Sequence, residues 1–227
     1  MPAGLVLDQQ VVDVVLAAGL RNHTHKVREV RPHPPRVRQH DLRRPVRFIG
    51  NRSSGKQGYA VAAEAATRGA KVTLVSTVSL PTPPGCDLVE VETAEQLRTA
   101  MTTAAANHDV IVMSAAVADF RPKAAAEGKL KKRDGTPEIV LEPTPDILAG
   151  LGAAKRAGQV LVGFAAETRD VDIYALDKLT RKNLDMIVAN QVGARLGFDE
   201  DENCVLILWT DGQESQGPTA KDDLARR

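Results

Sequence analysis

The chain has 227 residues, of which 43% are hydrophobic, 26% charged and 3% aromatic, and its formal net charge is +1. This length allows one substantial domain, and the composition is that of a globular protein whose core uses Val, Leu, Ile and Ala. No stretch of about 20 residues is free of charge, so the sequence predicts no transmembrane span and no membrane partner.

The N-terminal residues and the two cysteines indicate the cellular compartment. Asp8 and Asp13 interrupt the apolar run near the N-terminus, which argues against a secretory signal. The two cysteines, Cys86 and Cys204, are far apart and form no CxxC pair. This count fits a protein of the reducing cytoplasm and argues against a disulfide framework and a zinc site, and no metal-ligating residues are predicted.

The positive charge is concentrated in residues 21–47, which carry nine Lys or Arg against two acidic residues. Nucleic acid could bind such an arm, but no aromatic side chain interleaves the charges, so this interpretation is the less favoured one. The segment is also rich in Pro and His and lacks a helical period. The sequence therefore predicts a poorly ordered basic leader over residues 1–44 and a folded domain over residues 45–227.

Strands and helices alternate through the folded domain. Apolar runs predict strands at 46–49, 71–76, 109–113, 160–164 and 186–189, with helices at 60–67, 94–106, 145–156 and 173–182. A strand at 204–209 with a turn at Asp211-Gly212 predicts an edge hairpin. The order indicates a doubly wound, Rossmann-like α/β fold with a mostly parallel sheet and a small antiparallel edge hairpin. Ligands of such folds bind at the carboxyl ends of the strands.

The loop from Gly50 to Gln57 has the GxxxxGK spacing of a phosphate-binding P-loop. Gln57 stands where a P-loop NTPase has the Ser or Thr that ligates magnesium, which disfavours that class. A strand, a glycine-bearing loop and a helix N-terminus still make a good anion site, in which Asn51 and Gln57 could orient a carbonyl or carboxylate. Ser53 or Ser54 is the expected N-cap of the following helix. No GxGxxG follows a predicted strand, which disfavours a dinucleotide oxidoreductase.

Two further signals follow the strand at 109–113. Small residues from Ser114 lead to Asp119, which could hydrogen-bond a ribose, a base or a bound cation, or could only cap a helix. Lys129-Leu-Lys131-Lys132 is either a phosphate clamp or a solvated charge run.

Three more signals lie in the second half of the chain. Pro145-Asp146 is a rigid turn feeding a helix whose N-terminus could hold an anion. Phe164 could stack on a base or belong to the core. Lys178 and Lys182 are spaced i, i+4 and share one helix face, as a triphosphate would require.

These motifs occur in one order that resembles phosphopantothenate–cysteine ligase, the phosphopantothenoylcysteine synthetase half of the bacterial bifunctional coenzyme A enzyme. The resemblance covers about residues 45 to 212. It is carried by six motifs: Gly50-Asn-Arg-Ser-Ser-Gly-Lys, Ala115-Ala-Val-Ala-Asp-Phe-Arg, Lys129-Leu-Lys-Lys, Pro145-Asp-Ile, Val162-Gly-Phe-Ala-Ala-Glu-Thr and Lys182-Asn-Leu-Asp-Met-Ile-Val-Ala-Asn.

The resemblance implies CTP-dependent ligation of cysteine to 4′-phosphopantothenate through an acyl-cytidylate, giving 4′-phosphopantothenoylcysteine. By family match Asn51 assists the second half-reaction, Arg47 lies near the acidic substrate and Lys129 serves the nucleotide step. The implied CTP contacts are Met113, Ser114, Ala115, Asp119, Lys129, Pro145, Asp146, Ile147, Leu148, Phe164, Lys178 and Lys182. Mg²⁺ is expected to bridge the triphosphate, held largely by phosphate and water.

The resemblance also implies partners. The family acts as a homodimer, and a flavin-dependent decarboxylase is usually fused before the ligase or could be encoded separately. The space before residue 45 is too short for that domain, so no FMN is expected in this chain. Residues 9–20 are interpreted as a remnant of the connecting helix.

The chain departs from the family pattern at its N-terminal end. Arg44 stands in place of the family aspartate before Pro45-Val46-Arg47, and residues 27–43 replace an Ala-Gly-Gly-Thr loop. The C-terminal Leu224-Ala-Arg-Arg also stops inside what resembles the family's last helix. Two alternatives to an active ligase therefore stay open. One is an inactive or truncated relative that binds nucleotide without turnover, and the other is a nucleotide- or nucleic-acid-binding module that uses the basic arm.

Overall fold

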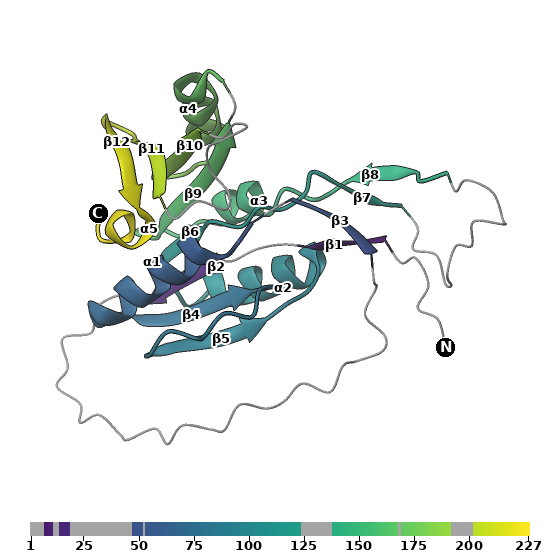
Figure 1. Cartoon of the computed structure of the whole chain (residues 1–227), viewed down its shortest axis with the longest axis horizontal. Coiled ribbons are helices and arrows are strands. Elements are labelled where there is room, and N and C mark those ends of the chain that lie inside the picture. The colour runs from purple at the N-terminus through teal and green to yellow at the C-terminus, as the bar shows by residue number, and fades with distance from the viewer. Residues whose placement is uncertain are drawn as a thin grey trace.

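The computed structural model describes residues 7–10, 14–18, 47–51, 53–123, 138–167, 169–191 and 202–227. An eight-stranded sheet lies at its centre, with helices on both faces (Figure 1). Its strands, in spatial order, are β12 (Gly212–Ala220), β11 (Glu202–Trp209), β10 (Met186–Gln191), β9 (Val160–Glu167), β6 (Val110–Met113), β2 (Val14–Ala18), β4 (Lys71–Ser76) and β5 (Cys86–Glu90).

Three neighbouring strands of this sheet position the site. Strand β9 is parallel to both β6 and β10, with Met113 opposite Gly163 and Val162 opposite Met186. The carboxyl ends of these three strands therefore meet at one edge, which is where doubly wound folds place their ligands. Strands β11 and β12 continue the sheet as an antiparallel hairpin.

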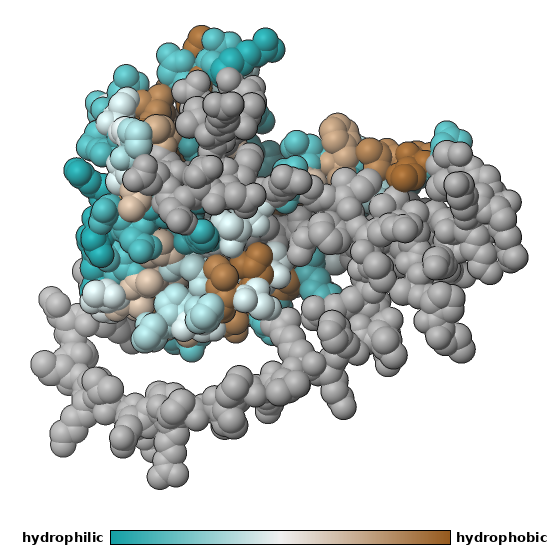
Figure 2. Space-filling model, in the orientation of Figure 1, coloured by the Kyte–Doolittle hydropathy of each residue, from teal (hydrophilic) through white to brown (hydrophobic). Residues whose placement is uncertain are grey.

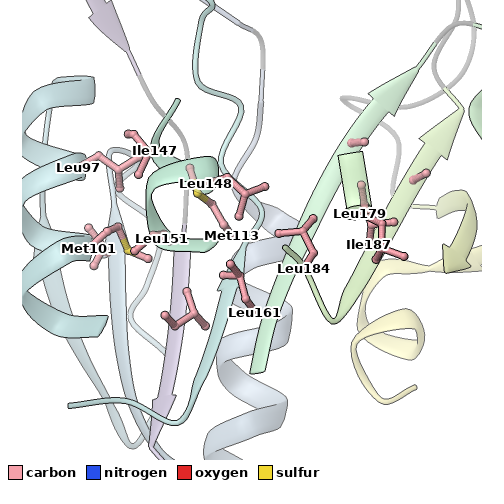
Figure 3. Packing of buried hydrophobic residues seen from close by; sticks show 14 of the residues in the cluster. Leu97, Met101, Met113, Ile147, Leu148, Leu151, Leu161, Leu179, Leu184 and Ile187 are labelled. Carbon is pink, nitrogen blue, oxygen red and sulfur yellow. The ribbon is translucent and has the colours of Figure 1, made fainter. Parts of the chain in front are cut away.

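The helices form two layers. Helices α2 (Ala94–Ala105), α3 (Ile147–Ala153) and α4 (Val171–Arg181) share one apolar cluster with β6, β9 and β10. Figure 3 shows the α2 side chains Leu97 and Met101 beside Ile147 and Leu151 of α3, respectively. On the opposite face, α1 (Lys56–Thr67) packs against β4, and α5 (Lys221–Ala225) packs through Leu224 against the β9–β11 strands.

Two smaller sheets accompany the main one. Strands β1 (Leu7–Gln10) and β3 (Arg47–Gly50) pair in parallel, and β7 (Phe120–Pro122) pairs antiparallel with β8 (Leu141–Pro143). The β7–β8 pair extends from the body as an arm (Figure 1), braced by a 2.8 Å ion pair between Arg121 and Glu142. Figure 2 shows apolar side chains on this arm, where Phe120, Ile139, Val140 and Leu141 are exposed.

The predicted α/β fold with its edge hairpin is confirmed, and most predicted elements differ from the observed ones by a few residues. Strand β4 has the predicted bounds of 71–76. Helix α2 begins after Thr93, whose side chain accepts a hydrogen bond from the Gln96 N–H in a capping box. Helix α3 is shorter than the predicted 145–156, because Asp146 is its N-cap.

The expected N-cap of α1 is wrong. Neither Ser53 nor Ser54 caps this helix; its N-cap is Gly55, in a left-handed conformation with φ of 75°. Glycine adopts this conformation without the Cβ clash of other residues, so the chain turns sharply into the helix. Helix α1 consequently starts at Lys56, four residues before the predicted start.

The N-terminal segment contributes to the fold in a way that the sequence did not predict. Strand β2 lies between β4 and β6 and is antiparallel to both, inside the segment interpreted as a leader. The helix predicted over residues 9–20 is wrong, because 14–18 form a strand; valines favour strands through their branched Cβ atoms. The strand predicted at 46–49 corresponds to β3, which lies outside the main sheet and pairs with β1. None of the helices described has both the length and the apolar character of a membrane span.

Two glycines of α3 allow a matched test of its packing. A Cβ at position 152 would lie 1.9 Å from the Lys182 carbonyl oxygen, whereas a Cβ at position 150 meets nothing within 4 Å. We expect Gly152→Ala to lower the free energy of unfolding by about 1–3 kcal/mol or more through overpacking. Gly150→Ala should leave it unchanged or raise it by about 0.5–1 kcal/mol. Urea denaturation measures both; equal effects of the two substitutions would contradict the close approach.

Candidate functional site

A first cavity, called here the α1 cavity, lies where the N-terminus of α1 meets the carboxyl ends of β6, β9 and β10. It encloses about 120 Å³. It is lined by Ser53, Ser54, Gly55, Gln57, Gly58, Ser114, Ala115, Ala116, Phe164, Ala165, Ala166, Asn190, Val205 and Lys221. None of these is acidic, and the hydroxyls, the amides and a lysine can all donate hydrogen bonds.

A second cavity, the α3 cavity, adjoins the first and encloses about 280 Å³. It is lined by Met113, Ala115, Val117, Ala118, Asp119, Thr144, Pro145, Asp146, Ile147, Leu148, Phe164 and Lys182. Ala115 and the half-buried Phe164 line both cavities, so the two cavities share a wall at these residues. A ligand in one cavity would therefore be close to a ligand in the other.

Lys182 and Asp146 form the charged end of the α3 cavity. The Lys182 Nζ lies 2.8 Å from Oδ2 of Asp146, and Oδ1 of Asp146 accepts a hydrogen bond from the Ala149 N–H at the start of α3. Partial burial opposes ionisation of Asp146, but the Lys182 hydrogen bond and the Ala149 N–H outweigh it and lower its pKa. Asp146 is therefore a carboxylate at neutral pH, and it orients the ammonium.

The turn that follows α4 fixes the position of Lys182. Asn183 has φ of 53°, a left-handed conformation that asparagine tolerates, and its side-chain amide donates to the Gly152 carbonyl oxygen of α3. Asp185 accepts hydrogen bonds from the Leu161 N–H of β9 and from Lys155 just after α3. The turn therefore joins α3, β9 and β10, and Lys182 is held at their junction.

Most of the residues implied as CTP contacts lie together. Nine of them line the α3 cavity: Met113, Ala115, Asp119, Pro145, Asp146, Ile147, Leu148, Phe164 and Lys182. Ser114 lines the α1 cavity. The Asn51 side-chain amide donates a 3.1 Å hydrogen bond to the Val117 carbonyl oxygen, which places Asn51 next to the α3 cavity.

Other predicted residues are elsewhere or undescribed. Lys178 pairs with Glu167 at the end of β9, at 2.5 Å, and lines neither cavity. Lys129 lies outside the described residues, and Arg47 belongs to β3, whose side chains are not described. Within the described ranges, no three His, Cys, Asp or Glu side chains are grouped to hold a metal ion.

Sequence reasoning missed two polar residues of the α1 cavity. Asn190 closes the last quoted motif, but no role was assigned to it; its side-chain oxygen is buried. The sequence does not indicate that Lys221 is part of a site, because this lysine follows an edge hairpin and is surrounded by charged residues that are expected to be exposed. Its burial becomes evident only once α5 is packed beside α1.

Fold and site together define a doubly wound α/β protein with paired ligand cavities at the carboxyl ends of its parallel strands. The family model described as "DNA/pantothenate metabolism flavoprotein C-terminal domain" matches residues 40–227, and the chain belongs to this family.

Sequence relatives agree with this assignment. The chain is 46% identical over 185 residues to the coenzyme A biosynthesis bifunctional protein CoaBC of Vibrio cholerae, covering 80% of this chain and 46% of the relative. It is 49% identical over 183 residues to CoaBC of Mycobacterium tuberculosis, covering 75% and 44%. The chain thus spans about half the length of these curated relatives.

Solved structures agree as well. The crystal structure of the C-terminal domain of CoaBC matches with a TM-score of 0.67 and 41% identity, covering 80% of this chain and 83% of that one. A DNA/pantothenate metabolism flavoprotein from Streptococcus pneumoniae matches with a TM-score of 0.66 and 20% identity, covering 81% of this chain and 89% of that one. A Cab2 variant in complex with phosphopantothenate-cysteine matches with a TM-score of 0.63 and 16% identity, covering 79% of this chain and 78% of that one. The last two support the fold.

The Asp146–Lys182 pair predicts a pH-dependent contribution to stability. A carboxyl whose pKa is lowered by folding stabilises the protein above its unfolded-state pKa, and this contribution is lost as the pH falls through the folded-state value. Asp146→Asn keeps a good N-cap but removes the charge, so we expect it to lower the free energy of unfolding by less than about 1 kcal/mol near pH 7. The difference should begin to shrink below about pH 4, the usual range of an aspartate pKa, and should vanish once the pH is below the lowered pKa of Asp146 in the folded protein.

Urea denaturation across pH measures this difference. Lys182→Met is the control background, in which Asp146→Asn should have little further effect. An equal effect of Asp146→Asn with and without Lys182 would show that the pair is not coupled.

Proposed function

We propose that this chain is the phosphopantothenate–cysteine ligase part of a coenzyme A biosynthesis enzyme, which uses CTP to join cysteine to 4′-phosphopantothenate. The observation that carries the proposal is the α3 cavity. Residues implied as nucleotide contacts come from four separate stretches of the chain, around residues 113–119, 145–148, 164 and 182, and they line this one cavity. Membership of the family and 41% identity to the C-terminal domain of CoaBC support the same activity.

The reaction has two steps because a carboxylate is a poor acylating agent. A carboxylate oxygen of 4′-phosphopantothenate attacks the α-phosphorus of CTP, the bond to the β-phosphate breaks, and pyrophosphate leaves. The resulting acyl-cytidylate carries CMP as a leaving group. The amine of cysteine then attacks the acyl carbon, CMP departs, and the amine loses a proton. Both steps build charge on oxygen atoms, so positioning and electrostatic stabilisation supply most of the catalysis.

Each cavity is suited to one part of this chemistry. In the α3 cavity, Lys182 offers a positioned positive charge for phosphate oxygens, and the Phe164 ring offers a face on which a base can stack. In the α1 cavity, serine hydroxyls and the first turn of α1 favour negatively charged groups. Because the two cavities share a wall at Ala115 and Phe164, a ligand group bound in the α1 cavity would lie close to one bound in the α3 cavity.

Asn51 is proposed to assist the second step. Its amide already donates to the Val117 carbonyl oxygen beside the α3 cavity, so it is oriented without a bound substrate. Arg47 and Lys129 are proposed to neutralise the acidic substrate and the nucleotide, respectively. The described residues offer no carboxylate cage, so Mg²⁺ would be held by phosphate oxygens and water, as is usual for nucleotide substrates.

The proposal includes the assembly in which the chain works. The chain is expected to form a homodimer and to work with a flavin-dependent decarboxylase that is fused to it or separate. The expected compartment is the cytoplasm. The curated relatives are bifunctional and about twice as long as the matched region, which supports a decarboxylase partner.

The test is the release of CMP and pyrophosphate from CTP, 4′-phosphopantothenate, cysteine and Mg²⁺. We expect CMP release to require cysteine and to fall by about 10²-fold or more in Asn51→Ala, the usual effect of losing one oriented donor. Asn107→Ala, which removes an exposed amide from the end of α2, is the matched control and should keep full activity. Replacing CTP with ATP tests the preference for the base.

Two results would contradict the proposal in different ways. If the folded protein binds CTP but releases no CMP, the chain is a nucleotide-binding relative without turnover. If it binds no nucleotide and its basic arm is protected by DNA or RNA from proteolysis, the binding-module alternative is correct.

A further inference from the structure

Helix α3 contacts Lys182 with both of its ends. At the N-terminal end, the carboxylate oxygens of the N-cap Asp146 lie 3.0 and 2.8 Å from the Lys182 Nζ. Near the C-terminal end, Gly152 lies so close to the Lys182 backbone that an added Cβ would be 1.9 Å from its carbonyl oxygen. Positions 146 and 152 are about 9 Å apart along a helix. One short helix therefore contacts both the ammonium and the backbone of this lysine.

The Asn183 side chain completes the second of these contacts. Its amide donates a 2.9 Å hydrogen bond to the carbonyl oxygen of Gly152, in the last turn of α3. The usual α-helical donor to that oxygen is the Arg156 N–H, which is bonded to the Gln159 Oε1 instead, and the Lys155 N–H is 3.4 Å away. Carbonyl groups at a helix end need donors from outside the helix, and Asn183 supplies one.

The backbone of Asn183 has a second requirement. Lys182 is the C-cap of α4, and Asn183 follows it with φ of 53°. A left-handed residue at this position turns the chain sharply away from the helix. Asparagine tolerates this conformation and also carries a short side chain with N–H donors. Glycine would meet only the first requirement, and alanine would meet neither.

We propose that Asn183 is a positioning residue for nucleotide binding: by bonding Gly152 it fixes the Lys182 backbone against α3, so that the ammonium stands in the α3 cavity beside Asp146. Asn183 is not among the described residues that line this cavity, so it acts through Lys182. A lysine side chain is long and flexible, and holding its backbone reduces the freedom that is lost when a phosphate binds. The role of Lys182 as a nucleotide contact rests on the function proposed above, whereas its coupling to Asn183 rests on the geometry.

The test is a double-mutant cycle on nucleotide binding, measured by isothermal titration of CTP and of cytidine. Lys182→Met should weaken CTP binding about 10-fold or more, the usual effect of losing a charged hydrogen bond. Asn183→Gly keeps the left-handed turn and removes only the amide, and it should weaken CTP binding about 3-fold to 10-fold. In the Asn183→Gly background, Lys182→Met should have a clearly smaller effect than in the unaltered protein. Cytidine has no phosphate and should bind equally to all four proteins.

Gln159 provides a matched control for a purely structural role. Its side-chain amide donates to the Ala105 carbonyl oxygen at 2.8 Å, so it too binds a carbonyl group at the end of a helix, in this case α2. Gln159 directly precedes β9 and therefore lies at the amino ends of the strands, opposite the cavities. Gln159→Ala should lower the unfolding temperature and leave the affinity for CTP unchanged. If Asn183→Gly behaves in the same way, the proposal is overturned.

Gly152→Ala tests the same contact from the other side, and it replaces Asn183→Gly if that variant does not fold. The added Cβ would displace the Lys182 carbonyl oxygen, so binding of CTP should weaken. Gly150→Ala is the control, because a Cβ at that position meets nothing within 4 Å. Equal affinities of the two alanine variants for CTP would contradict the proposal.

The same titrations distinguish this inference from the proposed ligase. If the affinity for CTP depends jointly on Lys182 and Asn183 but no CMP is released in the ligase assay, the inference stands and the proposed activity falls. If CMP is released and Asn183→Gly binds CTP as tightly as the unaltered protein, only the inference falls. If Lys182→Met binds CTP unchanged, Lys182 is not a nucleotide contact and the inference falls with that role.

Discussion

The turn from Lys182 to Asp185 is the constraint on which the site depends. Its first residue, Lys182, lies so close to Gly152 that no Cβ would fit there, and its second, Asn183, has a left-handed conformation. The Asp185 carboxylate accepts hydrogen bonds from the Leu161 N–H and from Lys155. These contacts join α3 and β9 to the turn that leads into β10. A rigid junction of this kind allows a flexible lysine to be aimed at one carboxylate, because the backbone beneath it has a single arrangement.

The two cavities divide the electrostatics of the site. The α1 cavity is lined by donors and a lysine, whereas the α3 cavity contains Asp119 and the Asp146–Lys182 pair. A polyanion is therefore favoured in the first, and a ligand with both donors and acceptors in the second. Ala115 and Phe164 line both cavities, so ligands in the two environments would lie close to one another.

Local patterns predicted the parts of this protein that depend on near neighbours in sequence. The apolar run at 71–76 predicted the bounds of β4, and the helix predicted at 94–106 differs from α2 by one residue. Most residues implied as nucleotide contacts line the α3 cavity. Features that depend on distant partners were missed. Lys178 faces Glu167 in the fold, and Lys221 becomes buried only because α5 packs beside α1. The antiparallel place of β2 is equally non-local, since hydrophobic alternation says nothing about which neighbour a strand will pair with.

The position of β2 has a consequence for the cooperativity of folding. Strands β4 and β6 are each hydrogen-bonded to β2, so the backbone ladder between the two halves of the sheet passes through residues 14–18. The half with α1, β4 and β5 has an apolar cluster of its own. The other half, with β6 and β9–β12, contains most of the larger apolar cluster. Val75 of β4 and the side chains of α2 also belong to that cluster, so side-chain packing connects the two halves. A short strand thus decides whether the sheet unfolds as one unit or as two, and the strands β6 and β9 that carry Met113 and Phe164 of the α3 cavity belong to the second half.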